Sequence, residues 1–362
     1  MPQLVVALEQ TAAGAGPETA RNMKLRLAQI FAEMGDQERA SEQLADLVKE
    51  VPQDRAALRQ LAELAANAQD WDSAANVYRE LIELEEGAAL VNTALDLWRV
   101  CERAGRLGDA LGGLERALEI APGNEELRLH IAQAYEANGD HRQLAAMLEA
   151  DAARASAVDD QLELMLRAGA LYLEPEGDVT EAVRVLEQVR ELSPENLTGV
   201  VLLARAFTAS GRGEEAIVLL TSTADAHHGK RIREMADVYA ELSRMHLEDG
   251  MLTDAMEALQ KACEMDLRNG TLAMQLGQLA LEIEEFDVAQ RAFRSASMMK
   301  PFKAETGEGI TSEARADAHY CLAWLAYNEG DVRKAKILAS KTLAENAQHE
   351  HALALMAELE TK

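Results

Sequence analysis

The sequence predicts an all-α protein, an α-solenoid built of about nine helix–turn–helix repeats. The main observation is a small or apolar residue that recurs at a period near 34 residues, which is typical of repeat arrays. These positions are Ala40, Ala74, Ala110, Leu144, Ala182, Ala216, Ala255, Ala289 and Ala335. A glycine such as Gly35, Gly105 or Gly330 stands about five residues before most of them. Such units stack on their neighbours, and their usual role is binding.

The composition supports a helical protein and restricts its partners. The chain has 362 residues, of which 48% are hydrophobic and only 4% aromatic, and it holds seven prolines. Its net charge of −27 disfavours nucleic acid as a general ligand and favours basic partners. The simpler interpretation is that the acidity keeps a long protein soluble.

Each repeat has the same internal order of residue types. Small residues in both helices allow a close crossing, a glycine ends the first helix, and a proline often stops the second. In the first repeat the positions are Leu27, Ala28, Phe31, Gly35, Ala40, Leu44, Leu47 and Pro52. This pattern resembles the tetratricopeptide repeat, a 34-residue helix–turn–helix unit. The resemblance covers roughly residues 21–349 and implies a right-handed superhelix; Gln69 and Glu284 stand where the turn glycine is expected.

We expect three parts along the chain. Residues 1–20 are expected to form a partial repeat or capping helix, residues 21–349 the array, and residues 350–362 a C-terminal capping helix. Insertions are expected near residues 86–89, 152–160, 174–177, 224–233 and 302–314. Most of them separate alternate repeats, so the array either derives from a two-repeat module or has drifted in its surface loops. The first segment either caps the array or marks a cut from a longer chain.

Three common catalytic motifs are missing from the sequence. GxxxxGK[ST], GxSxG and HExxH are all missing, and neither His227–His228 nor His349–Glu350–His351 offers the three or four ligands that zinc needs. We therefore expect no enzymatic activity, no cofactor and no metal.

Cysteine usage and hydropathy favour a cytoplasmic protein. Cys101, Cys263 and Cys321 lack CxxC spacing, which indicates free thiols in a reducing compartment. No apolar run is long enough for a signal peptide or a membrane span. We therefore expect a cytoplasmic, bacterial-type protein that does not insert into a membrane.

The resemblance also implies where a partner binds. In tetratricopeptide arrays the first helices line a concave groove that holds a protein or peptide. By this analogy Arg99, Arg103, Arg205 and Arg244 are expected to pair with partner carboxylates. Gln278 occupies the same repeat position as Arg99, Arg205 and Arg244 and is suited to hydrogen bonding.

The last repeat carries a second candidate site. Tyr320, Trp324 and Tyr327 recur at spacings of three and four, which places them on one helical face, with Asn328 beside them. Tyrosine and tryptophan often dominate binding energy, although a C-terminal helix could equally cover these rings as core. The segment from Arg291 to Lys341 is also locally basic, with nine Lys or Arg against six Asp or Glu.

These features predict a non-catalytic scaffold that binds a protein or peptide in the groove or at the C-terminal end. One alternative is a regulatory segment of a longer enzyme. Another is an adaptor of the cell envelope or motility machinery that docks a small globular protein such as a Ras-like GTPase, which would need a broad convex or edge surface.

Overall fold

A computed structural model of the chain describes residues 7, 8, 10, 11, 14–174, 177–300, 302 and 309–361. These residues form helices, and the only β pairing among them is an isolated bridge between Asn269 and Gly309. They fall into two compact units, residues 1–147 and 148–362, which are described separately below. Part of the expected N-terminal capping segment, namely residues 1–6, 9, 12 and 13, lies outside the described residues.

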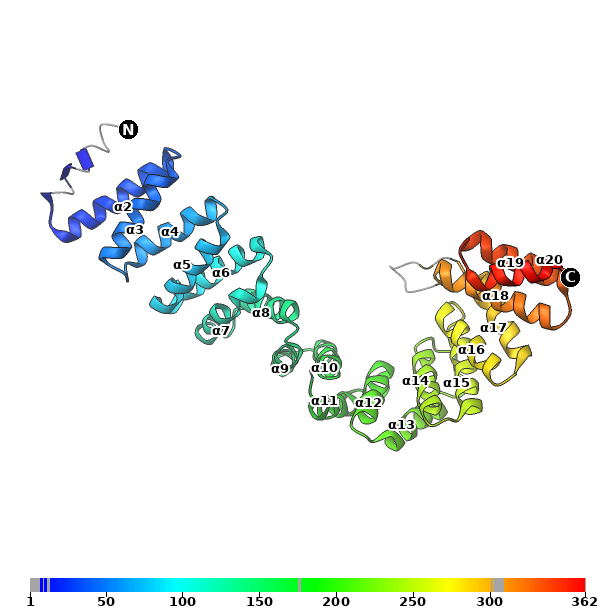
Figure 1. The fold of residues 1–362 in the computed structure, drawn as a ribbon. Helices are drawn as coiled ribbons and strands as arrows, with labels where there is room; N and C mark the ends of the chain where they lie inside the picture. Colours follow the sequence, from blue (N-terminus) through cyan, green and yellow to red (C-terminus); the bar gives the residue numbers. More distant parts are fainter. Residues whose placement is uncertain are drawn as a thin grey trace. The chain divides into compact units, whose positions relative to one another are not determined.

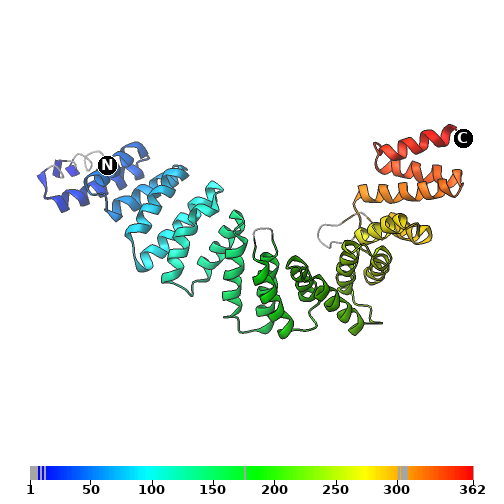
Figure 2. The same cartoon turned by 60° about the horizontal axis from the view of Figure 1, so that its bottom comes forward.

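The N-terminal unit is a series of helices that pack in pairs, which Figure 1 shows in blue to green. The helices are α2 (Pro17–Glu33), α3 (Gln37–Glu50), α4 (Arg55–Asn67), α5 (Trp71–Leu84), α6 (Gly87–Ala104), the 3-10 helix η1 (Leu107–Ala110), α7 (Leu111–Ile120), α8 (Glu125–Asn138) and the first part of α9 (His141–Ala152). In Figure 2 the two helices of a pair lie side by side and antiparallel.

The C-terminal unit continues the same alternation. Its helices are the rest of α9, α10 (Val158–Tyr172), α11 (Val179–Leu192), α12 (Leu197–Ala209), α13 (Gly213–Ala226), α14 (Met235–Glu248), α15 (Leu252–Met265), α16 (Gly270–Glu282), α17 (Phe286–Met298), α18 (Ser312–Asn328), α19 (Val332–Glu345) and α20 (Glu350–Thr361). The last helix, α20, packs on both α18 and α19.

The repeating small position lies at the centre of each helix pair. All nine residues that define the period, from Ala40 to Ala335, are 0% exposed. The approach is so close in the α16–α17 pair that a Cβ added to Gly277 would lie 2.6 Å from the Phe293 ring. Since the buried positions follow the predicted period, the α-solenoid is confirmed.

The turns inside the repeats use left-handed backbone, as the glycines predict. Gly35, Gly105 and Gly330 have φ angles of 80°, 70° and 83°. Gln69 and Glu284 adopt φ angles of 62° and 64° at the two positions where the glycine is replaced. An L-residue pays a steric penalty in this conformation, so these two turns are strained relative to the others.

Ion pairs link some neighbouring repeats. Asp54 caps the N-terminus of α4 by accepting hydrogen bonds from the Ala56 and Ala57 amides, and its carboxylate is buried. Arg21 of α2 donates Nη2 to Asp54 Oδ1 at 2.6 Å, so one carboxylate satisfies both a helix end and an arginine of the preceding repeat.

Backbone hydrogen bonds join the two ends of the insertion before the last repeat. Its residues 303–308 and Pro301 lie outside the described part of the chain. Phe302 N donates to Ile310 O at 2.8 Å, and Ile310 N donates to Lys300 O at 3.2 Å. Gly270 N donates to Gly309 O at 3.0 Å, which ties the end of the insertion to the start of α16.

Replacing Gln69 by glycine is expected to stabilise the N-terminal unit. The substitution removes the left-handed penalty but makes the unfolded chain more flexible, so the net gain should be about 0.5–1 kcal/mol. Urea unfolding of the full chain measures the gain. Ala68→Gly is the matched control, because Ala68 has an ordinary φ of −78° and should lose stability. A Gln69→Gly midpoint at or below that of the wild type would contradict the strain argument.

Asp54→Ala is expected to cost about 2–3 kcal/mol, since it removes both a helix cap and the partner of Arg21. Asp70→Ala is the matched control, because Asp70 caps α5 through Ser73 N but is exposed, and it should cost about 1 kcal/mol. Urea midpoints give both values. Equal losses in the two variants would rule out a contribution from the ion pair.

Acid should remove the contribution of Asp54. The hydrogen bond from Arg21 holds the pKa of Asp54 below its ordinary value of 3.8. Because the folded-state pKa is the lower one, this stabilisation is present above pH 3.8 and is lost as the pH falls through the folded-state pKa. The stability difference between wild type and Asp54→Ala should therefore shrink at low pH in the same urea experiment.

Candidate functional site

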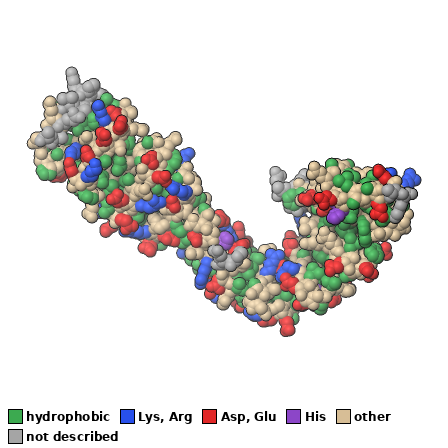
Figure 3. Space-filling view, viewed as in Figure 1, with side chains coloured by type: hydrophobic (Ala, Val, Ile, Leu, Met, Phe, Trp, Pro, Cys, Tyr) green, Lys and Arg blue, Asp and Glu red, His purple; other side chains and the backbone are tan. Residues whose placement is uncertain are grey.

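Charge alone does not single out a binding surface. Figure 3 shows acidic and basic side chains interspersed on the visible face of both units. The candidate residues must therefore be judged by their repeat position, their exposure and their partners.

Four predicted residues occupy the same repeat position in the C-terminal unit. Arg205 lies on α12, Arg244 on α14, Gln278 on α16 and Trp324 on α18, each on the first helix of its repeat. The Arg205 and Arg244 side chains are 54% and 41% exposed, Trp324 is 38% exposed, and Gln278 is exposed. We call these four residues the first-helix row.

A buried carboxylate lies beneath the two arginines of the row. Glu241 on α14 is 3% exposed. Its Oε2 accepts from Arg205 Nε at 2.9 Å, and its Oε1 accepts from Arg244 Nη2 at 2.6 Å. Arg244 also pairs with Glu248. Burial acts to lower the pKa of Arg244, but the bond to Glu241 prevails and the pKa is raised, so the guanidinium stays charged.

Glu241 was not among the predicted site residues. Its position three residues before Arg244 is a sequence signal for an ion pair on one helix face. Its bond to Arg205 joins two repeats, and no local spacing indicates that contact. Both arginines thus compensate a buried charge while their side chains stay partly exposed.

The two predicted arginines of the N-terminal unit lie on α6. Arg99 Nη1 donates to Asp96 Oδ1 at 2.8 Å, and its side chain is 65% exposed. Arg103 is exposed and makes no ion pair with any residue that the structure describes. Both arginines therefore lie on the surface, and Arg99 forms an ion pair there.

The three aromatic rings of the last repeat have different environments. The Tyr320 ring is tilted against His349, with centroids 5.0 Å apart, and stacked on His351, with centroids 5.7 Å apart. The Tyr327 hydroxyl donates to Glu358 of α20, and both tyrosines pack against the cluster that includes Leu355 and Leu359. The C-terminal helix thus partly covers the two tyrosines.

Trp324 lies outside this cluster and stays accessible to a partner, and Asn328 is exposed near the end of α18. Of the three predicted rings, the two tyrosines therefore pack against α20 and Trp324 lies on the surface. Sequence spacing placed the three rings on one helix but could not show which of them α20 reaches.

The three cysteines are thiols of weak reactivity, of which Cys101 is buried and Cys263 and Cys321 are half-buried. Burial raises the pKa of Cys101 to about 11 and the pKa of Cys263 and Cys321 to about 12, so the nucleophilic thiolate is scarce at neutral pH. All three are free. Within the described ranges, no group of three or more His, Cys, Asp or Glu is arranged to hold a metal ion.

No helix among the described residues is both long and apolar enough to cross a membrane.

Comparisons with known proteins place the repeats in a family and give distant relatives. Sequence models described as tetratricopeptide repeat match residues 25–89, 176–242 and 236–269. The chain is 27% identical over 215 residues to cellulose synthase 2 operon protein C of Komagataeibacter xylinus, a match that covers 57% of this chain and 16% of that protein. The chain thus spans a small part of the length of this relative.

Two solved structures illustrate the structural neighbours. The Naa15/Naa10 complex bound to HypK-THB is 15% identical, with 94% of this chain and 57% of that chain covered and a TM-score of 0.46. Yeast Tom70 is 13% identical, with 96% of each chain covered and a TM-score of 0.36. The assignment rests on the helix pairs with their buried small positions and on the three family matches, and by these the chain is a tetratricopeptide repeat protein.

Proposed function

We propose that the chain is a non-catalytic scaffold that binds an extended segment of a partner protein along the first-helix row. Tetratricopeptide arrays in general support a role in protein interaction. The observation that carries the specific proposal is the exposure of Trp324. This large aromatic side chain is 38% exposed on α18, the first helix of its repeat. Exposed tryptophans at the centre of an interface often dominate its binding energy.

The arginines of the row supply the polar part of the proposed contact. Arg205 holds Glu241 through Nε, which leaves its Nη1 and Nη2 without a hydrogen bond to any described residue. A guanidinium presents five N–H donors in a fixed plane, so Arg205 can bind Glu241 and a partner carboxylate or carbonyl together. Gln278 lies between the arginines and Trp324 in repeat order and can donate and accept toward a peptide backbone.

The N-terminal unit offers additional contacts. Arg103 is exposed on α6, and Arg99 is exposed while paired with Asp96. We assign them to the same class of interaction, with partner carboxylates as the targets. Asn328 next to the row is a further polar contact in this proposal.

The proposal extends to the location and chemistry of the chain. Three free thiols, one buried and two half-buried, support a reducing compartment and therefore the cytoplasm. Their raised pKa values argue against cysteine nucleophilic catalysis.

Trp324→Ala should weaken partner binding by about 2 kcal/mol, roughly 30-fold, because it removes the apolar anchor of the row. The measurement compares proteins retained from a lysate of the source cells by immobilised wild type and variant, with quantitative mass spectrometry. Phe286→Ala is the matched control, because Phe286 is also an exposed ring in this unit, at 47%, but lies at the start of α17 outside the row.

A protein that depends on Trp324 but not on Phe286 is the expected result. Circular dichroism must show the same helical content in both variants. If Trp324→Ala folds normally and retains every protein that the wild type retains, the row is not the binding site.

The second candidate function is that of an adaptor for proteins that make a cell-envelope polysaccharide. It is supported by the 27% identity to a cellulose synthase operon protein and agrees with the expectation of a cell-envelope adaptor. Deleting the gene and measuring cellulose against the parent strain tests it. Unchanged cellulose in a strain that makes this polymer would reject the candidate and leave the general scaffold role intact.

A further inference from the structure

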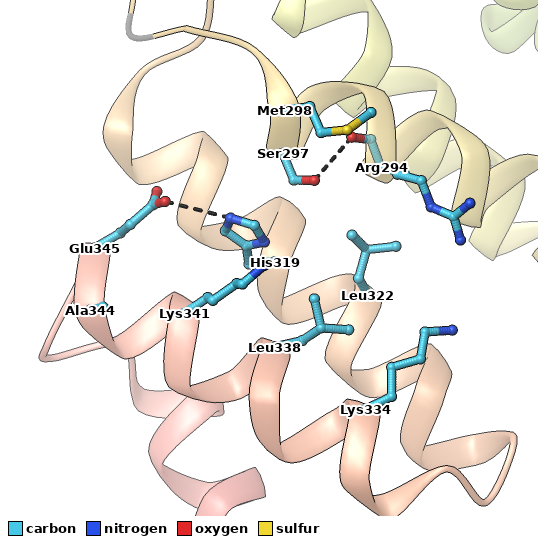
Figure 4. A pocket seen from close by; sticks show the side chains of 10 residues that line it. All are labelled: Arg294, Ser297, Met298, His319, Leu322, Lys334, Leu338, Lys341, Ala344 and Glu345. Carbon is cyan, nitrogen blue, oxygen red and sulfur yellow. Dashed lines mark hydrogen bonds and ion pairs between the residues drawn. The ribbon is translucent and has the colours of Figure 1, made fainter.

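The last two repeats form an open cavity of about 510 Å³ between α17, α18 and α19. Figure 4 shows the side chains that line it. On α18 it is lined by His319 and Leu322. At 100° per residue, these two lie roughly 140° and 160° around the helix from Trp324. The cavity is therefore a different surface from the first-helix row, and its volume is within the range of ligand sites.

Three cations line the cavity, and none is fully neutralised. Arg294 comes from α17, and Lys334 and Lys341 come from α19. Arg294 Nη2 donates to the neutral Gln290 side chain at 3.1 Å, and Lys334 Nζ lies 3.6 Å from Glu329 Oε2. Lys341 is exposed and has no ion pair with a described residue.

The one carboxylate in the wall is already engaged. Glu345 Oε2 accepts from Arg315 Nε at 2.9 Å, and its Oε1 lies 3.5 Å from His319 Nε2. The cavity is therefore locally positive although the whole chain carries a charge of −27. Local positive charge in an acidic protein selects for an anionic group that is held at short range.

The floor of the cavity is apolar. It includes Leu322 of α18 and Leu338 of α19, and Met298 of α17 reaches the same space with 73% of its surface exposed. A methionine at an exposed site adapts its shape to an incoming side chain. The cavity thus combines anion-binding groups with a surface for an aliphatic side chain.

One ring nitrogen of a buried histidine in the wall lacks a hydrogen-bond partner among the described residues. His319 is 8% exposed, and its Nδ1 has no hydrogen-bond partner among the described residues. Burial lowers its pKa, so the ring is neutral at pH 7. With the Nε2 proton facing Glu345, Nδ1 is an acceptor and can take a hydrogen bond from a peptide N–H. His319 and Lys341 both line the cavity.

We propose that this cavity binds an acidic segment of a partner protein that carries an aliphatic side chain. Aspartate or glutamate side chains pair with Arg294, Lys334 and Lys341, and the aliphatic group rests on Leu322, Leu338 and Met298. His319 can accept a hydrogen bond from a peptide N–H, and the apolar floor can hold a side chain, which together favour a polypeptide over a simple inorganic anion. This site is independent of the first-helix row.

The test is fluorescence anisotropy of the full chain with a labelled peptide of alternating glutamate pairs and leucines. Saturable binding to the wild type is expected. The double variant Lys334→Gln, Lys341→Gln should bind at least roughly 10-fold more weakly, because it removes two of the three pocket cations. The double variant Arg333→Gln, Lys336→Gln is the matched control: both residues are exposed on α19 with the same charge, but neither lines the cavity. It should change affinity by less than about 2-fold.

Further measurements separate the charged and the apolar contributions to binding. Replacing glutamate by glutamine or leucine by serine in the peptide should each abolish binding, and Met298→Ser should weaken it. The Trp324→Ala variant should bind the peptide as the wild type does, which distinguishes this site from the row.

Equal losses in the two double variants would overturn the proposal, since a diffuse field would then explain the binding. Full displacement of the peptide by millimolar inorganic phosphate would also overturn it, because the site would then hold a simple anion. No binding to the wild type would overturn it as well.

Discussion

The close approach of two helices at one small residue is the constraint on which each repeat depends. All nine positions from Ala40 to Ala335 are fully buried, and most of them hold only a methyl group. A larger branched side chain there would overpack the crossing and force the helices apart. Once this crossing is fixed, every other position of the repeat has a defined face. The same crossing therefore determines both the core and the residues that are left for binding.

Two carboxylates that become buried by this stacking are each paired with an arginine of the preceding repeat. Arg21 holds the buried Asp54, and Arg205 with Arg244 holds the buried Glu241. Removing one partner of such a pair leaves a buried charge, which costs more than the pair itself contributes. Arg205 and Arg244 of the first-helix row thus stabilise the fold through Glu241 and are also exposed to solvent. A substitution at either arginine would therefore change both the stability of the fold and the proposed binding, whereas Trp324 makes no such bond to a buried charge.

Local patterns were sufficient to predict the repeats, the turns and the buried positions. The period, the glycines and even the two replaced glycines, Gln69 and Glu284, correspond to backbone features of the structure. The environment of the candidate site required contacts between distant residues. Tyr320 and Tyr327 pack against α20, some thirty residues later in the chain, and are partly covered by it, whereas Trp324 on the same helix lies outside that cluster. The cavity likewise combines Arg294, His319 and Lys341 from three helices, and only the excess of basic residues in that segment indicated it.

The two proposed binding surfaces lie on two sides of one helix, α18. Trp324 faces one side of α18, while His319 and Leu322 face the cavity on the other. A partner with two linked segments could occupy both surfaces, and the second contact would then form at a high effective concentration. Two weak contacts of this kind give tight binding without a deep groove, provided that the linker spans the helix. α20 packs on α18 and α19, and the two sides of α18 differ in chemistry.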